Sequence, residues 1–255
     1  MIEGGIRISN PEIKKKEPLI TIITVVKNGE KFFEECIESV LNQSYKNFEY
    51  IIIDGNSTDR THEILKKYES FIEYYLIDED KGLYDGFNKG MKHVNGKYFG
   101  YVNSDDVLLP NALKILSEYI NNNPTKDFFF GAVKKHWGIL WGYKPWKINF
   151  SWGFYSSHST GFYIKKTSAE KVGQYNLKYK YSADYDYFYR MIVKHKLKGI
   201  GTKKNELFGI FRRGGFSSTI NFWEHFGEEI RIRLDNGQNK ILIFSVTIIF
   251  IITFF

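Results

Sequence analysis

Short apolar runs alternate with segments of helical periodicity along the first half of the chain. Residues 19–26 are mostly β-branched and entirely apolar or threonine, which is typical of a strand buried on both faces of a sheet. Apolar residues then recur at helical spacing up to residue 43. The same alternation predicts strands at 48–53, 71–77 and 98–102, and helices at 61–68 and 83–94. Strands separated by helices favour right-handed crossovers, so the pattern predicts an α/β fold with a mainly parallel central sheet flanked by helices.

The second half of the chain is less regular. We expect a helix at 111–123 and a strand at 127–133, after which residues 134–154 contain four tryptophans and no clear periodicity. Further elements are expected as strands at 161–164 and 206–211 and helices at 167–172 and 182–194. There is no internal repeat or linker composition, so we expect one domain at 1–217, with halves at about 18–106 and 107–217 that share a cleft. A basic helix and an apolar tail follow at 218–255.

Composition limits the class of protein. A chain of 255 residues with 43% hydrophobic residues can bury a substantial core. The single cysteine, Cys36, excludes an intramolecular disulfide and any multi-cysteine metal site, which is typical of the cytoplasm. No apolar core follows the basic residues near the N-terminus, so we expect no secretory signal.

The net charge of +7 favours an anionic partner. Charge alone leaves open a nucleotide diphosphate, an acidic membrane face and nucleic acid. We expect no nucleic acid, because no recognisable element combines basic residues with interleaved stacking aromatics.

Residues 241–255 contain no charged side chain and follow Arg231, Arg233 and Lys240. As a helix they would extend about 22 Å at ~1.5 Å per residue, against a hydrocarbon core of about 30 Å. We therefore expect this tail to lie on a membrane surface, with the basic residues at its anionic cytoplasmic face. A core element of the domain and a shortened transmembrane helix are the alternatives.

Carboxylates follow two of the predicted parallel strands. Asp54 ends the second strand, and Asp105 and Asp106 follow the strand at 98–102. Ligands of open α/β sheets bind outside the carboxyl ends of the strands, so these three side chains are candidates for one polar site. Adjacent carboxylates repel unless solvent or a cation offsets their charge, and hard oxygen ligands suit Mg²⁺ or Mn²⁺. The alternative is that the aspartates only cap helices and stabilise turns.

The loop Asp80-Lys81-Gly82 is a weaker candidate. It offers a positive side chain and free backbone N–H groups at the start of a helix, which suit a diphosphate. Neither G-x-G-x-x-G after the first strand nor G-x-x-x-x-G-K-[ST] occurs, which counts against dinucleotide oxidoreductases and P-loop enzymes.

The predicted helix at 182–194 carries two carboxylates on different faces. Asp186 has a partner in Arg190 four residues later, which leaves Asp184 as the free carboxylate, or as a simple helix cap. Taken singly, His158, Arg212 and Arg213 have residue types that are more often found in surface or packing roles than in catalysis.

Four segments together carry a family resemblance. They are FEYIIIDGNSTDRT (48–61), DEDKGLYDGFNKGM (78–91), GKYFGYVNSDD (96–106) and SADYDYFYRM (182–191). In this order and spacing they closely resemble family 2 glycosyltransferases with a GT-A fold, over about residues 18–217. The branch that they are most similar to builds bacterial capsular, O-antigen and colanic-acid-type polysaccharides.

The resemblance implies a role for each candidate residue. Those on the nucleotide-sugar side are Thr24, Asp54, Asp80, Lys81, Gly82, Asn103 and Asp105. The ligands of Mg²⁺ or Mn²⁺ would be Asp105 and Asp106, and Asp184 matches the catalytic base. His158, Arg212 and Arg213 fall on the acceptor side.

The activity implied by the resemblance is inverting hexosyl or N-acetylhexosaminyl transfer from a nucleotide-diphosphate sugar to a hydroxyl of a glycan. The acceptor would be lipid-linked, at the inner face of the cytoplasmic membrane. One carboxylate base and a divalent cation suit this chemistry, because the acceptor loses a proton while an anionic diphosphate departs.

Three departures from the branch pattern stand out. Asn103 replaces the first acid of the Asp-x-Asp form found elsewhere in the superfamily, Gly86 stands where alanine is usual, and Ser159 replaces a glutamine. Two rival functions are a nucleotidyltransferase and a catalytically silent nucleotide-sugar-binding protein. The first usually has a glycine-rich basic loop after strand one, and the second would tolerate loss of the acids.

Overall fold

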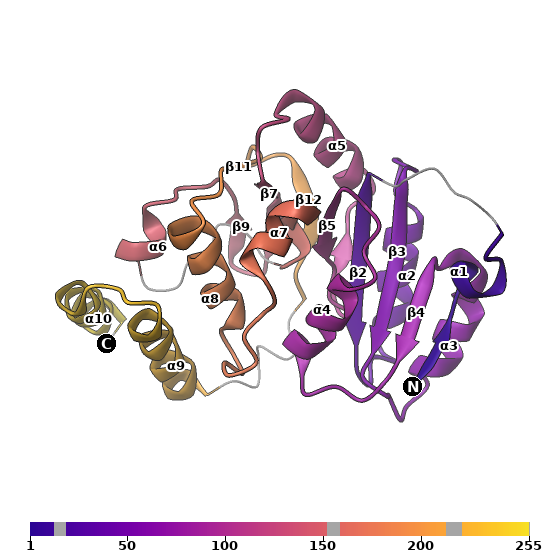
Figure 1. The fold of residues 1–255 in the computed structure, drawn as a ribbon, viewed down its shortest axis with the longest axis horizontal. Coiled ribbons are helices and arrows are strands. Elements are labelled where there is room, and N and C mark those ends of the chain that lie inside the picture. The colour runs from indigo at the N-terminus through magenta and orange to yellow at the C-terminus, as the bar shows by residue number, and fades with distance from the viewer. Residues whose placement is uncertain (13–18, 152–158, 213–220, 255) are drawn as a thin grey trace.

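The computed structural model describes residues 1–12, 19–151, 159–212 and 221–254, and its centre is an eight-stranded sheet (Figure 1). The strands lie in the order β1, β4, β3, β2, β5, β10, β7, β11. Their bounds are β1 Ile2–Gly4, β2 Ile20–Val26, β3 Phe48–Asp54, β4 Tyr74–Ile77, β5 Tyr98–Tyr101, β7 Phe128–Phe130, β10 Phe162–Lys165 and β11 Gly199–Gly201. The block β4–β3–β2–β5 is parallel throughout, which confirms the predicted parallel centre.

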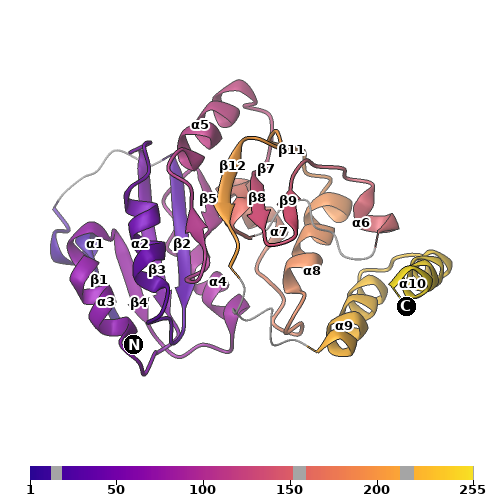
Figure 2. The same ribbon diagram turned by 180° about the vertical axis from the view of Figure 1, so that it is seen from behind.

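Helices cover both faces of the parallel block. Helix α4 (Leu83–Met91) lies on one face, while α2 (Phe33–Leu41) and α3 (Thr61–Tyr68) lie on the other (Figures 1 and 2). Along β2, Ile23 belongs to the apolar core under α4, whereas Ile22 belongs to the core under α2. The continuous apolar run at 19–26 is thus explained, because both faces of its strand are buried.

The expected strand at 127–133 is divided between two sheets. Strand β7 remains in the large sheet, while β8 (Ala132–Lys135) joins a four-stranded sheet in the order β6, β12, β8, β9. The other strands of this small sheet are β6 Val107–Leu108, β9 Gly138–Leu140 and β12 Leu207–Ile210. The division falls at Gly131, where a Cβ atom would lie 2.3 Å from the ring of Phe208. Only glycine permits this close approach, and the chain changes sheet there.

Three helices of the second half are close to their predicted positions: α5 Ala112–Asn122, α7 Lys166–Val172 and α8 Ala183–Tyr189, the last continued by a π-helical turn at Arg190–Lys194. The short helix α6 (Lys147–Phe150) lies in the stretch at 134–154 for which no helix was predicted. The N-terminal lead-in, to which the sequence pattern assigned no element, contains β1 and the short helix α1 (Ile6–Ser9). Arg7 ties this segment to the buried Glu49 of β3, a contact between distant residues that local periodicity does not reveal.

The tail forms two helices, α9 (Phe222–Asp235) and α10 (Lys240–Phe254), at the end of the molecule opposite β1 (Figures 1 and 2). The Phe250 ring of α10 stacks on Phe226 of α9, with 5.8 Å between centroids. Arg233 was expected at a membrane face, but it is fully buried and donates to the carbonyl oxygens of Asn149 and Ser151. Within the described residues, every helix is too short or too polar to span a bilayer.

Candidate active site

Asp54 ends β3 and its side chain is fully enclosed. Its Oδ1 atom accepts hydrogen bonds from the backbone N–H and the hydroxyl of Ser57, at 2.9 and 2.7 Å. Its Oδ2 atom lies 2.9 Å from Nε2 of His62. Burial raises the pKa of the Asp54 carboxyl, and the hydrogen bonds from Ser57 and the contact with His62 oppose that rise. Asp54 therefore stabilises the turn that follows its strand, a role that the sequence had left open.

Asp80 lies directly over the backbone that follows Asp54. A Cβ atom on Gly55 would come within 2.1 Å of Asp80 Oδ2, so a larger residue there would displace the Asp80 carboxylate. The Gly82 N–H donates to Asp80 Oδ1 at 3.0 Å, and the Lys81 N–H donates to Asp85 at 3.1 Å. The sequence suggested that the backbone N–H groups of this loop are free to bind a diphosphate. In the structure, these two N–H groups are bonded to carboxylates instead. The Lys81 side chain is exposed at the same edge of the sheet.

The turn after β5 carries the carboxylate motif and contacts residues next to strands of both sheets. Asp106 is only 1% exposed, because its Oδ2 accepts the Thr160 hydroxyl at 2.7 Å and its Oδ1 accepts the Arg212 N–H at 3.2 Å. Asn103 donates from Nδ2 to Ser159 Oγ at 2.9 Å. Asp105 is partly exposed. Both acids lie in a polar turn after β5, but Asp106 is buried there and only Asp105 is partly exposed.

This turn suits a divalent cation in its donor chemistry. Asn103 Oδ1 is buried and has no hydrogen-bond partner among the described residues, and two carboxylates follow it. Nowhere in the described ranges do three His, Cys, Asp or Glu side chains gather into a complete metal cage. Mg²⁺ is usually held by one or two carboxylates together with substrate phosphates, so the donor set is consistent with an ion shared with a diphosphate.

Asp184 lies in the first turn of α8, where its Oδ1 accepts the Tyr84 hydroxyl at 3.2 Å. The same hydroxyl lies 3.1 Å from the carbonyl oxygen of Tyr181. Tyr84 is buried on α4, so its contact with Asp184 joins the two halves of the chain. Asp184 is half-buried, which is compatible with a carboxylate that both reaches a ligand and is held in orientation.

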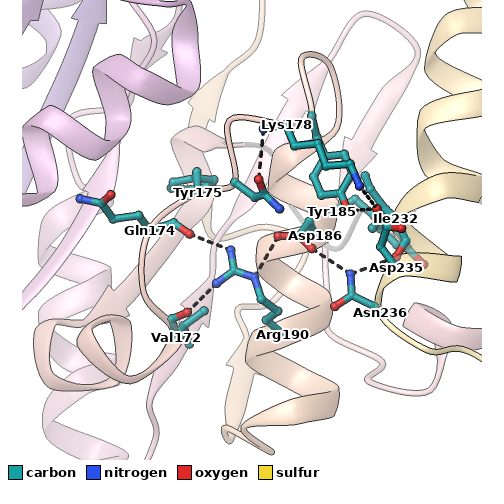
Figure 3. A network of polar contacts seen from close by, with 12 residues as sticks. Val172, Gln174, Tyr175, Lys178, Tyr185, Asp186, Arg190, Ile232, Asp235 and Asn236 are labelled. Atoms are coloured by element: carbon teal, nitrogen blue, oxygen red, sulfur yellow. Dashed lines mark hydrogen bonds and ion pairs between the residues drawn. The ribbon is translucent and has the colours of Figure 1, made fainter.

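Asp186 is committed to structure. Its Oδ2 accepts from Arg190 Nε at 2.9 Å, as the sequence predicted, and its Oδ1 accepts from Asn236 at 2.8 Å (Figure 3). Arg190 also donates to the carbonyl oxygen of Gln174 at 2.8 Å. Both oxygens of Asp186 are thus occupied at the junction between α8 and the end of α9, whereas Asp184 is the carboxylate of this helix that is only half-buried.

The remaining candidates are placed differently. Thr24 is fully buried, and its hydroxyl accepts the Tyr50 hydroxyl at 2.9 Å inside the core, away from any accessible surface. The Arg212 side chain pairs with Glu35 and lies over the Phe32 ring, while its backbone supports Asp106. His158 and Arg213 lie outside the described residues.

Lys135 is a residue that the sequence pattern did not single out. It ends β8, is half-buried, and holds its ammonium group 4.4 Å from the centroid of the Phe211 ring. Burial lowers the pKa of Lys135, and the negative charges of Asp106 and Asp184 oppose that fall. The charge of Lys135 therefore responds to both carboxylates.

Comparison with known protein sequences identifies relatives of this chain. Residues 21–188 match the family model described as glycosyl transferase family 2. An uncharacterized glycosyltransferase of Rickettsia prowazekii is 31% identical over 68% of this chain and 58% of its own length. A PGL/p-HBAD biosynthesis glycosyltransferase of Mycobacterium bovis is 26% identical over 80% of each chain. The chain thus spans somewhat more than half of the Rickettsia relative.

Solved structures show a similar fold at low sequence identity. Residues 1–349 of Staphylococcus aureus TarS, in complex with UDP, give a TM-score of 0.62 at 15% identity, covering 89% of this chain and 69% of TarS. The Pyrobaculum calidifontis mannosyltransferase PcManGT, in complex with GDP-Man and Mn²⁺, gives 0.67 at 15% identity, covering 91% and 69%. The parallel block with flanking helices is thus a GT-A type of α/β fold, and with the family match over most of its length the chain belongs to glycosyl transferase family 2.

Proposed function

We propose that this glycosyltransferase moves a hexosyl or N-acetylhexosaminyl group from a nucleotide-diphosphate sugar to a hydroxyl of a glycan, with inversion at the anomeric carbon. The observation that carries the proposal is the donor set of the turn after β5, where the buried Asn103 Oδ1 has no hydrogen-bond partner among the described residues and Asp105 and Asp106 follow. Asp184 on α8, which accepts the Tyr84 hydroxyl at 3.2 Å, is the separate carboxylate that we propose as the base. A transferase needs that pair, because one group handles the departing diphosphate and the other the acceptor proton.

The donor side is assigned to the ends of β3, β4 and β5. Asp54 and the Asp80–Gly82 loop lie beside the nucleoside, and Asn103 and Asp105 lie beside the diphosphate. Mg²⁺ or Mn²⁺ would be held by Asp105 and Asp106 and would offset the charge of the leaving group. Lys135 adds a fixed positive charge on the same side, from a half-buried position where water screens it less than at the surface.

Asp184 acts as the base in this proposal. Its carboxylate takes the proton of the acceptor hydroxyl as the oxygen forms a bond to the anomeric carbon, and the bond from that carbon to the diphosphate oxygen breaks. Nucleoside diphosphate leaves with the bonding electrons. A single displacement from the side opposite the leaving group inverts the anomeric carbon. Tyr84 donates to one oxygen of Asp184 and holds the carboxylate in orientation.

The apolar tail supports our proposal for the kind of acceptor and for the cellular location of the enzyme. Exposed fractions of 62–77% at Ile241, Phe244, Ile249 and Ile252 give α10 an apolar surface that a lipid interface would cover. Arg231 and Lys240 are exposed beside it and would meet an anionic cytoplasmic face. We therefore propose a lipid-linked glycan acceptor, used in cell-surface polysaccharide synthesis at the inner face of the cytoplasmic membrane. His158, Arg212 and Arg213 are retained as acceptor-side residues of this proposal.

The test is donor hydrolysis, which requires no knowledge of the acceptor. The full chain is incubated with UDP-glucose, UDP-N-acetylglucosamine or GDP-mannose and Mn²⁺ or Mg²⁺, and released nucleoside diphosphate is measured. We expect slow hydrolysis of at least one donor, and a loss of about 10²-fold or more in Asp184→Asn with donor binding retained. Binding without turnover would favour the silent binding protein. Pyrophosphate release from a nucleoside triphosphate and a sugar phosphate would favour the nucleotidyltransferase.

A further inference from the structure

One side chain of helix α9 bonds to the backbone of the segment that leads into α8. The carboxylate of Glu228 accepts three successive backbone N–H groups: Lys180 donates to Oε1, and Tyr181 and Ser182 donate to Oε2, each at 2.7 Å. Successive N–H groups that converge in this way form a concave anion site, which Glu228 fills from within the same chain. Charge-assisted bonds of this kind are stronger than neutral ones.

The start of α8 depends on this contact. Ser182 occupies the N-cap position, yet its side chain makes no capping hydrogen bond, and its hydroxyl is buried without a partner among the described residues. An N-cap side chain normally fixes a helix start by accepting the N–H of the second or third helical residue. At α8 the chain is fixed one step earlier, because Glu228 of a different helix accepts the N–H groups of Ser182 and of the two residues before it.

Residues 180–182 are also linked to the proposed base through Tyr84. The Tyr84 hydroxyl lies within hydrogen-bond distance of the Tyr181 carbonyl oxygen and of Asp184 Oδ1. A shift of residues 180–182 would therefore move the start of α8 and change the contact between Tyr84 and Asp184. A general base acts only within hydrogen-bond reach of the proton it takes, so small displacements of its carboxylate reduce the rate strongly.

We propose that Glu228 is a positioning residue for Asp184, so that α9 completes the catalytic site. The inference rests on the proposed role of Asp184 as base. Further along the chain, at the end of α9, Asn236 bonds to Asp186 and Asp235 bonds to Lys178 (Figure 3). The two contact regions together set the register of α9 along α8.

The same helix supplies a matched control. Glu224 lies one turn before Glu228 and accepts the side-chain hydroxyl of Tyr181 at 3.1 Å, at an exposed position. Glu224→Gln removes the same charge from the same face of α9 but leaves the three backbone bonds intact. Glu228→Gln and Glu228→Asp are the test variants, and the second keeps the negative charge in case the first does not fold.

The experiment is a double-mutant cycle with Asp184→Asn, measured as hydrolysis of whichever of the three donors named above is turned over fastest. We expect kcat to fall by about tenfold or more in Glu228→Gln, with the KM for donor within about twofold of the original. In the Asp184→Asn background the same substitution should cause no further loss, because the base that it positions is absent. Glu224→Gln should leave kcat unchanged.

Two results would overturn the inference while the proposed function stands: full kcat in a folded Glu228 variant, or an equal loss with and without the Asp184 carboxylate. Full activity of Asp184→Asn would overturn both proposals.

Amide exchange gives a readout that is independent of turnover. The N–H groups of residues 180–182 should exchange faster in Glu228→Gln than in Glu224→Gln, and equal exchange would also contradict the inference.

Discussion

The two adjacent aspartates after β5 differ in what surrounds them. Asp106 is enclosed by the Thr160 hydroxyl and the Arg212 N–H, whereas Asp105 is partly exposed. Asp106→Ala leaves both donors without their acceptor, and each such loss costs about 1–3 kcal/mol. We therefore predict that Asp106→Ala lowers the free energy of unfolding, while Asp105→Ala leaves it nearly unchanged. Urea unfolding measures both.

Both substitutions should remove Mn²⁺-dependent binding of nucleoside diphosphate, which calorimetry with UDP or GDP measures. Unchanged binding in Asp105→Ala would contradict the proposed metal role. Equal stability of the two variants would contradict the structural role assigned to Asp106.

Lys135 and its neighbour Lys134 form a natural pair for testing charge at the site. Lys134 is exposed, whereas Lys135 is half-buried and interacts with Asp106 and Asp184. If Lys135 bonds to the diphosphate that we propose on its side of the site, its loss should weaken nucleoside diphosphate binding by about tenfold or more in Lys135→Ala, since a hydrogen bond to a charged group contributes about 1.5–3 kcal/mol. Lys134→Ala should leave it unchanged, although both variants lose one positive charge. Equal affinities in the two variants would show that only the net charge matters.

At the scale of elements, Gly131 decides where one strand ends and the next sheet begins. A methyl group there would press on Phe208, and overpacking of this kind costs about 1–3 kcal/mol. Gly227 lies in the middle of α9, where an added Cβ atom would meet no other atom within 4 Å. We predict that Gly131→Ala lowers the melting temperature and Gly227→Ala raises it, since alanine favours a helix by about 0.5–1 kcal/mol over glycine. Thermal unfolding by circular dichroism distinguishes the two; a stable Gly131→Ala would contradict the account of the strand division.

The parts of the fold that follow local periodicity could be predicted from sequence. The helix expected at 61–68 has those bounds, and the expected pairing of Asp186 with Arg190 is present, because both depend on residues within a few positions. The small sheet and the N-terminal strand depend on partners far along the chain. β12 and β8 are joined in one sheet although more than 70 residues separate Gly209 from Val133.

The residues of the candidate site likewise include some that a local sequence motif indicates and others that no local pattern indicates. Motif spacing gave Asp54, Asp105, Asp106 and Asp184 as candidates, and their roles stay predictions. The partners that enclose Asp106, Thr160 and Arg212, lie 54 and 106 positions further along the chain. Glu228 reaches its three N–H partners over 46–48 positions. Lys135 lies at the edge of a stretch with no periodicity. None of these three environments has a local signal in the sequence.

At the scale of the whole molecule, the proposed membrane association depends on α10. We predict that the full chain sediments with vesicles containing phosphatidylglycerol and that a chain lacking residues 241–255 does not. The shortened chain should remain folded and hydrolyse donor, because α9 and its bonds to α8 are retained. Vesicle sedimentation and circular dichroism measure the two properties.

Two side chains of α10, Ile243 and Val246, are buried at 6% exposure, so some loss of stability is expected on truncation. Aggregation or unfolding of the shortened chain would instead favour a core role for this helix. Neutral phosphatidylcholine vesicles are the control for the contribution of Arg231 and Lys240, and they should bind the full chain less tightly than anionic vesicles.

The single thiol of the chain is enclosed next to the carboxylate motif. Cys36 on α2 donates to the Asn103 carbonyl oxygen at 3.3 Å and is fully buried, and that burial raises its pKa to about 12. At pH 8 the folded protein should therefore resist alkylation by iodoacetamide, whereas the protein in concentrated urea should react at one site. The rate of alkylation then measures how often α2 separates from the turn at Asn103. A nucleoside diphosphate with Mn²⁺ that binds this turn should slow the reaction, so that one cysteine reports donor binding without any acceptor or turnover.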